Sequence, residues 1–145
     1  MGFIDFIANI FTGPVIAFIG ATLAATMAGI GSARSVGFVG EAAAGVISED
    51  PGLFGKLLIL QALPGTQGIY GLLTWFMVMM QGGFLAGKAA SISMEQGWQF
   101  FAACVPIMVV GYFSAIYQGK VSVAGCAIVA KKPEEQAKAI VLAAM

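Results

Sequence analysis

The sequence contains no histidine, only two cysteines and few charged residues. Seven Lys or Arg and seven Asp or Glu among 145 residues give a formal net charge of zero. Without histidine the chain lacks the commonest metal ligand and proton shuttle of proteins, and it offers no Ser/His/Asp or Cys/His set. Without a basic tract it has no electrostatic footprint for nucleic acid. We therefore expect no enzyme active site within the chain and no nucleic-acid partner.

The two cysteines are predicted to be buried thiols. Cys104 and Cys126 fall on one predicted helix, 22 residues apart in the sequence. At a rise of about 1.5 Å per residue their separation is roughly 33 Å, much longer than a disulfide can span. The two thiols therefore cannot pair with each other.

Apolar residues are what the sequence has in abundance. They make up 59% of the chain, and the mean hydropathy is +0.93, which is typical of an integral membrane protein. Charge-free runs cover residues 6–33, 57–87 and 96–119. Each exceeds the ~20 residues that a helix needs to cross a ~30 Å hydrocarbon core. Because Asp5 stands where a signal peptide would have basic residues, we expect the first run to be a retained membrane helix.

These runs predict an all-α integral membrane protein built as a tandem duplicated helical hairpin. The first hairpin is expected over residues 1–80, with helices at about 14–47 and 54–80. An extracytoplasmic loop follows at 81–97, and the second hairpin occupies 98–145.

The duplication is visible in the loops. Pro51, Lys56 and Leu60 recur as Pro133, Lys138 and Leu142, each 82 residues later. The fourth helix begins near Lys138 and is expected to be cut off at Met145. A complete span would need roughly 15 to 20 further residues.

The basic residues predict the orientation in the cell membrane. Only Lys88 falls on one side; six others lie on the side of the two proline-containing loops, namely Arg34, Lys56, Lys120, Lys131, Lys132 and Lys138. Since basic residues favour the cytoplasmic side, loops 48–52 and 131–135 are predicted to be cytoplasmic, with the N-terminus outside.

A polar face interrupts the second apolar run. Leu63, Thr66, Gln67 and Tyr70 stand at i, i+3, i+4 and i+7 on a helix, where a carbonyl, a hydroxyl, an amide and a phenol share one face. Pro64 cannot donate to the preceding turn, so a carbonyl is freed there. Such a face can hold a small cation, and an intramembrane polar site is a functional hypothesis by default. Hydrogen bonding that merely joins helices is the simpler alternative.

Several motifs together resemble the rotor-ring proteolipid, known as K or c, of bacterial V-type ATPases. They are Leu63-Pro64-Gly65-Thr66-Gln67-Gly68, Gly29-Ile30-Gly31-Ser32-Ala33, Gln118-Gly119-Lys120-Val121 and Ala130-Lys131-Lys132-Pro133-Glu134. The resemblance implies a four-helix protein assembled with identical copies into a ring. It also implies rotation of that ring against a stator membrane subunit, coupled to ATP hydrolysis in a soluble head. Central-stalk subunits are then expected at the cytoplasmic loops.

The resemblance also implies the residues of an ion site. In sodium-carrying members the ion is held by a Leu carbonyl, a Thr and two Gln, which correspond to Leu63, Thr66, Gln67 and Gln118. Tyr70 matches a tyrosine that hydrogen-bonds a glutamate of the fourth helix. That glutamate is absent from this sequence; its expected position matches Gly65 of the first hairpin, just beyond the fourth helix as given.

The carried ion is predicted to be Na⁺, because several oxygen ligands would be surplus for a proton. Two alternatives remain open: an H⁺-carrying ring of the same class, and a structural membrane ring or channel wall with no carried ion.

Two helices carry stripes of small residues, which allow close packing in lipid. One stripe comprises Gly20, Ala24, Ala28 and Ser32; the other comprises Gly111, Ala115 and Gly119. Pairing of helices inside one protomer would explain them. We favour the crowded interior of a ring, with the first and third helices inside and the second and fourth outside.

Overall fold

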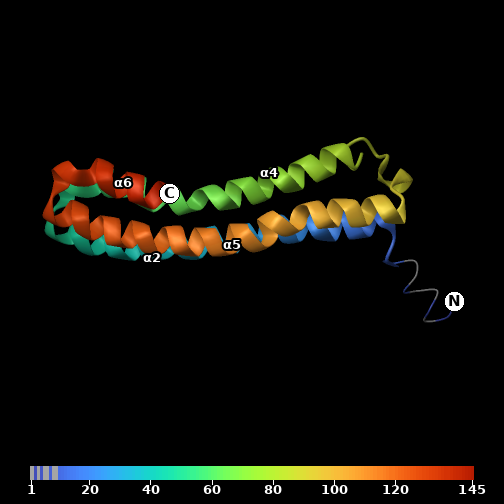
Figure 1. Ribbon diagram of the computed structural model, residues 1–145, viewed down its shortest axis with the longest axis horizontal. Coiled ribbons are helices and arrows are strands. Elements are labelled where there is room, and N and C mark those ends of the chain that lie inside the picture. The colour runs from blue at the N-terminus through green and yellow to red at the C-terminus, as the bar shows by residue number, and fades with distance from the viewer. Residues whose placement is uncertain (1, 3, 5–6, 8–9) are drawn as a thin grey trace.

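The chain forms an elongated helical bundle in two layers. The structure, a computed structural model, describes residues 2, 4, 7 and 10–145, so Asp5 lies outside the described residues. Helices α2 (Gly13–Glu49) and α5 (Met94–Lys131) run side by side along the whole bundle (Figure 1).

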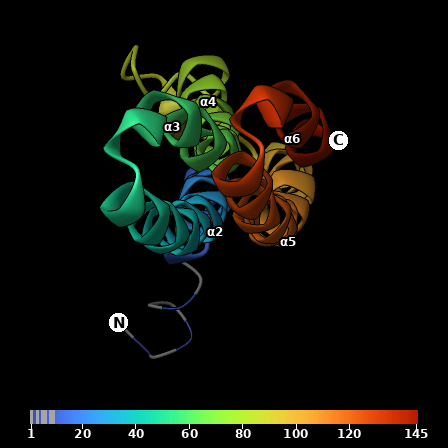
Figure 2. The ribbon, with the colours of Figure 1, turned by 90° about the vertical axis from the view of Figure 1, so that its left-hand side faces the viewer.

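Helices α4 (Thr66–Gln81) and α6 (Gln136–Ala144) lie over this pair, one toward each end. The end-on view in Figure 2 shows the two layers, with α3 (Phe54–Ala62) beside α6. The predicted all-α fold is confirmed.

The second predicted helix is divided at its proline. Helix α3 is followed by the 3₁₀ turn η2 (Leu63–Gly65) and then by α4. Pro64 has no N–H to donate to the carbonyl one turn earlier, so regular α-helical bonding stops there. Among the described residues, α2 and α5 are the helices that are long and apolar enough to cross a membrane unbroken.

Turn chemistry determines where the second hairpin begins. Residues 82–93 form the connection and include the 3₁₀ turn η3 (Ala89–Ser91); Gly83 adopts a φ of +70° in it. Helix α5 then begins at Met94, four residues before the predicted start of the hairpin at 98. The reason is a capping box, in which the Ser93 hydroxyl accepts from the Gln96 N–H and the Gln96 side chain accepts from the Ser93 N–H.

The helix boundaries repeat as the sequence predicts. The 3₁₀ turn η4 (Pro133–Glu135) follows η1 (Pro51–Leu53) by 82 residues, and α6 begins 82 residues after α3 begins. The two copies also contact each other. The Lys56 ammonium donates to the Pro133 carbonyl at 2.8 Å, and the Gln136 amide donates to the Lys56 carbonyl at 3.3 Å.

The small-residue stripes pack α2 against α5 within one protomer. A Cβ added at Gly111 would lie 3.1 Å from the Ala28 Cβ, and one added at Gly119 would lie 2.8 Å from the Ser35 Cβ. Gly20 approaches the backbone of Phe101 in the same way. Pairing inside one protomer therefore accounts for the contacts of the stripes; that the first and third helices form the crowded interior of a ring stays a prediction. The small residues are buried because the two long helices touch nearly backbone to backbone.

The buried apolar residues form two clusters with a polar level between them. One cluster joins α2, α3, α5 and α6 and includes Val39, Leu57 and Val129; it also holds Cys126. The other joins α2, α4 and α5 around Ala21, Val78 and Cys104. Both cysteines are free and buried, as predicted. Gln67 of α4 and Gln118 and Ser114 of α5, all half-buried, lie at the level between the clusters.

Candidate cation site

The site is built where α4 begins, because η2 ends the preceding helix there. Pro64 is fully buried, which anchors the turn against the bundle. Gly68 allows α2 to approach: a Cβ at that position would lie 3.3 Å from the Ser32 side chain. The Ser32 hydroxyl accepts a hydrogen bond from the Gly68 N–H at 2.8 Å. The first turn of α4 is thus held against α2 while its other side faces α5.

Three oxygen atoms meet in this first turn. The Thr66 Oγ1 lies 3.0 Å from the Leu63 carbonyl oxygen and 3.2 Å from the Gln67 Oε1. The hydroxyl has one hydrogen, so it can donate to only one of these two acceptors at a time. Three oxygens with one shared hydrogen form an electron-rich group. Small hard cations prefer such oxygen ligands.

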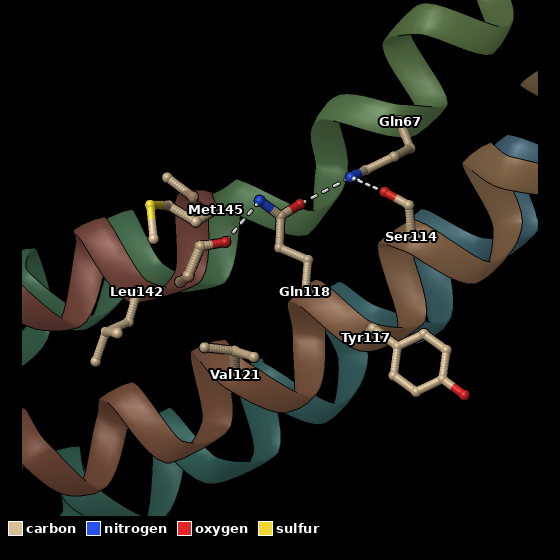
Figure 3. Close-up of a pocket in the computed structure, with 9 residues that line it drawn as sticks. Gln67, Ser114, Tyr117, Gln118, Val121, Leu142 and Met145 are labelled. Atoms are coloured by element: carbon tan, nitrogen blue, oxygen red, sulfur yellow. Dashed lines mark hydrogen bonds between the residues drawn. The ribbon is translucent and has the colours of Figure 1, made fainter.

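A chain of amide hydrogen bonds connects this group to the other layer and to α6. The Gln67 Nε2 donates to the Ser114 Oγ at 2.9 Å and to the Gln118 Oε1 at 2.9 Å (Figure 3). The Gln118 Nε2 in turn donates to the Ala143 carbonyl oxygen at 2.9 Å. Helices α4, α5 and α6 therefore share one polar network.

A pocket of about 290 Å³ opens beside the two glutamines. It is lined by Gln67, Ser114, Tyr117, Gln118, Val121, Leu142, Ala143, Ala144 and Met145. None of these side chains is charged. The Tyr117 hydroxyl points away from the amides, whereas Gln67, Gln118 and Ser114 point toward one another (Figure 3).

The structure brings four of the five predicted site residues together. Leu63, Thr66, Gln67 and Gln118 are joined by hydrogen bonds, directly or through one another. Tyr70 is 56% exposed and does not line the pocket, because it lies a further turn along α4.

The sequence analysis overlooked Ser114. The available signal was its spacing: Ser114 precedes Gln118 by four residues, so on a helix both side chains share one face. The contact with the Ala143 carbonyl could not be recognised from sequence, because it depends on how α5 and α6 pack.

Comparison with known proteins identifies the chain. The family of ATP synthase C subunits matches residues 19–78 and 101–145, which include every residue of the polar network. The chain belongs to this family. It is 46% identical over 133 residues to the V-type sodium ATPase subunit K of Enterococcus hirae, covering 92% of this chain and 81% of that relative. It is 36% identical over 131 residues to the A-type ATP synthase subunit K of Methanocaldococcus jannaschii, covering 90% of this chain and 54% of that relative.

Membership of the family shows the general function of the chain. The chain is a rotor-ring subunit of a V- or A-type ATPase, assembled in a ring and embedded in a membrane. Subunits of this kind have no catalytic site of their own. The open question is what the polar network carries.

Proposed function

We propose that the ring formed by copies of this chain carries Na⁺ across the cell membrane, coupled to ATP hydrolysis or synthesis by the soluble head of the complex. The observation that carries the proposal is the group of three oxygens at Leu63, Thr66 and Gln67, with a single hydrogen between them. A proton carrier would not need three preorganised oxygens. The 46% identity to a sodium ATPase subunit supports the same ion.

Each ligand has an assigned atom. The Leu63 carbonyl, the Thr66 hydroxyl and the Gln67 Oε1 would contact the ion from the start of α4. The Gln118 Oε1 would contact it from α5, through the lone pair that the Gln67 Nε2 does not use. These are neutral oxygen donors, which suit a monovalent hard cation.

A negative charge must accompany the ion in the membrane, because a bare charge at the centre of a bilayer costs at least ~2.5–3.5 kcal/mol. The resemblance implies that a glutamate of the fourth helix supplies it, held by Tyr70. The loaded site is then neutral and can face lipid as the ring turns. The exposed position of Tyr70 on α4 suits contact with a group outside the pocket.

The orientation follows from the basic residues. We place loops 48–52 and 131–135 in the cytoplasm and the N-terminus outside, because six of seven basic residues lie on the loop side. The cytoplasmic loops would then meet the central-stalk subunits. The stator membrane subunit would meet the polar network as each copy passes it.

Substitution of Thr66 by Val tests the ion directly. The change keeps the shape of the side chain and removes one ligand oxygen, a contact to a charge worth about 1.5–3 kcal/mol. The Na⁺ concentration for half-maximal ATP hydrolysis by the purified complex should rise roughly 10- to 150-fold.

The matched control is Thr74→Val. The Thr74 hydroxyl lies further along the same helix and donates locally to the Tyr70 carbonyl at 2.9 Å. This variant should keep the Na⁺ dependence of the parent. A parent complex whose hydrolysis and ion transport ignore Na⁺ at every pH would overturn the proposal and favour H⁺.

A further inference from the structure

Ser114 occupies a specific place in the polar network. It lies on α5 one turn before Gln118, is half-buried, and lines the same pocket. Its Oγ is 2.9 Å from the Gln67 Nε2 (Figure 3). Nothing in its position suggests direct contact with the three-oxygen group, because the Gln67 amide lies between them.

The contact uses the last free hydrogen of the Gln67 amide. An amide nitrogen carries two hydrogens, and the Gln67 Nε2 has two acceptors, the Ser114 Oγ and the Gln118 Oε1. With both hydrogens directed at α5, the Gln67 Oε1 faces the Thr66 hydroxyl. The oxygen end of the amide is therefore presented to the three-oxygen group, and the hydrogen-bearing end is kept away from it.

The reverse orientation of the Gln67 amide, with its nitrogen toward Thr66, would disfavour cation binding. It would direct an N–H group at the Thr66 hydroxyl, where it would repel a cation and occupy one of the proposed ligands. The Gln118 amide opposes this reversal, because its own Nε2 is held by the Ala143 carbonyl and its Oε1 must face Gln67. Ser114 completes the arrangement by accepting the second hydrogen.

We infer that Ser114 is a positioning residue of the cation site, which fixes the Gln67 amide with its oxygen toward the ion. The inference rests on the proposed function, since it assigns Ser114 a role in that same site. Its effect passes through Gln67, so it alters the affinity for the ion while the helices stay packed.

The test is Ser114→Ala in the intact ATPase complex. The half-maximal Na⁺ concentration for ATP hydrolysis should rise about 3- to 10-fold, the factor expected for one lost hydrogen bond, while the maximal rate at saturating Na⁺ is kept. Ser114→Thr retains a hydroxyl and should restore the parent value. A role in packing alone would change the yield or heat resistance of the complex without moving the Na⁺ dependence.

Ser122→Ala is the matched control on the same helix. The Ser122 Oγ is buried and has no hydrogen-bond partner within the described part of the chain, so its removal should leave the Na⁺ dependence unchanged. If Ser114→Ala lowers assembly, Ser114→Cys keeps the size with a weak acceptor and should show the same direction of change.

Two failures can be told apart. An unchanged Na⁺ dependence in both the Ala and Cys variants, alongside the expected loss in Thr66→Val, overturns the role of Ser114 and leaves the proposed function standing. A parent that shows no Na⁺ dependence overturns both.

Discussion

Helix α5 makes two contacts of opposite character. Against α2 it packs through glycines: a Cβ at Gly31 would lie 2.8 Å from both the Cα and the carbonyl oxygen of Tyr112. Against α4 and α6 it packs through the two apolar clusters and, between them, through a polar level made of Gln67, Ser114 and Gln118. The first contact depends on shape: at Gly20, Gly31 and Gly119 an added Cβ would lie 2.8 Å from an atom of the facing helix. The polar level depends on the orientation of hydrogen-bond donors and acceptors.

The difference indicates how the protein separates stability from function. In a membrane, close packing of small residues holds helices together without a hydrophobic driving force. The polar groups are then free to be arranged for an ion. Substitutions in the α2–α5 contact should therefore remove the ring, whereas substitutions in the α4–α5 contact should leave the ring and change the ion affinity.

The largest effect is expected from Gly31→Leu. A leucine there must displace the backbone of Tyr112, which costs more than the about 1–3 kcal/mol typical of overpacking. We expect no intact ring after detergent extraction, as measured by native gel electrophoresis. Gly55→Leu is the matched control, because a Cβ at Gly55 meets nothing within 4 Å. Intact rings from both variants would show that α2 and α5 do not need this approach.

Gln118→Leu should give the next largest effect. It changes the polar contact of α5 with α4 and α6, and the effect is expected on ion affinity. It removes the acceptor for Gln67, the donor to the Ala143 carbonyl and one proposed ligand. The Na⁺ affinity should fall by about 100-fold or more, with rings still recovered. Loss of rings with unchanged Na⁺ affinity in the remaining complexes would assign Gln118 to structure alone.

Lys56→Met probes a polar contact at the loops, away from the ion. It removes the 2.8 Å bond to the Pro133 carbonyl, and we expect the ring to dissociate at a lower temperature by an amount equivalent to about 1 kcal/mol. Lys138→Met is the matched control, because Lys138 is the counterpart of Lys56 in the second hairpin. Its ion pair with Glu135 is largely exposed, since the Lys138 side chain is 74% accessible, and should contribute less. Equal decreases in the dissociation temperature would mean that the two lysines contribute equally to ring stability.

Thr22→Val should have the smallest effect. The Thr22 Oγ1 is buried without a hydrogen-bond partner in the part of the chain that the structure describes. Replacing the hydroxyl by a methyl of similar size should leave ring stability unchanged or raise it by up to about 1 kcal/mol, as measured by thermal dissociation. A clear loss of stability would show that this hydroxyl has a partner in the assembled ring.

The sequence predicted most of the fold, because the strongest signals were long and local. Charge-free runs and the repeat of Pro51 as Pro133 indicated the long helices and the duplicated boundaries. It did not predict the start of α5, since the Ser93–Gln96 capping box is a short motif inside a polar connection. The sequence also left the partner of the small-residue stripes open, because a stripe indicates close packing without showing which helix makes it.

The site was predicted only in part, because some of its residues have a local sequence signal and others are recognised only by their contacts. Thr66, Gln67 and Gln118 are conspicuous polar residues in apolar runs, and their types suggest cation ligands. Ser114 is one of several serines in the chain, so only its distance to Gln67 distinguishes it. The Ala143 carbonyl lies beside Gln118 because the second hairpin packs α6 against α5, which requires the fold to be known.

The central claim is that the polar network of α4 and α5 holds Na⁺. Binding of radioactive sodium to the purified, assembled complex tests it most directly. We expect saturable binding that excess unlabelled Na⁺ displaces, and loss of that binding in Gln67→Leu with the ring intact. Saturable binding that survives Gln67→Leu would place the ion elsewhere, and an active parent complex with no saturable binding would contradict the account.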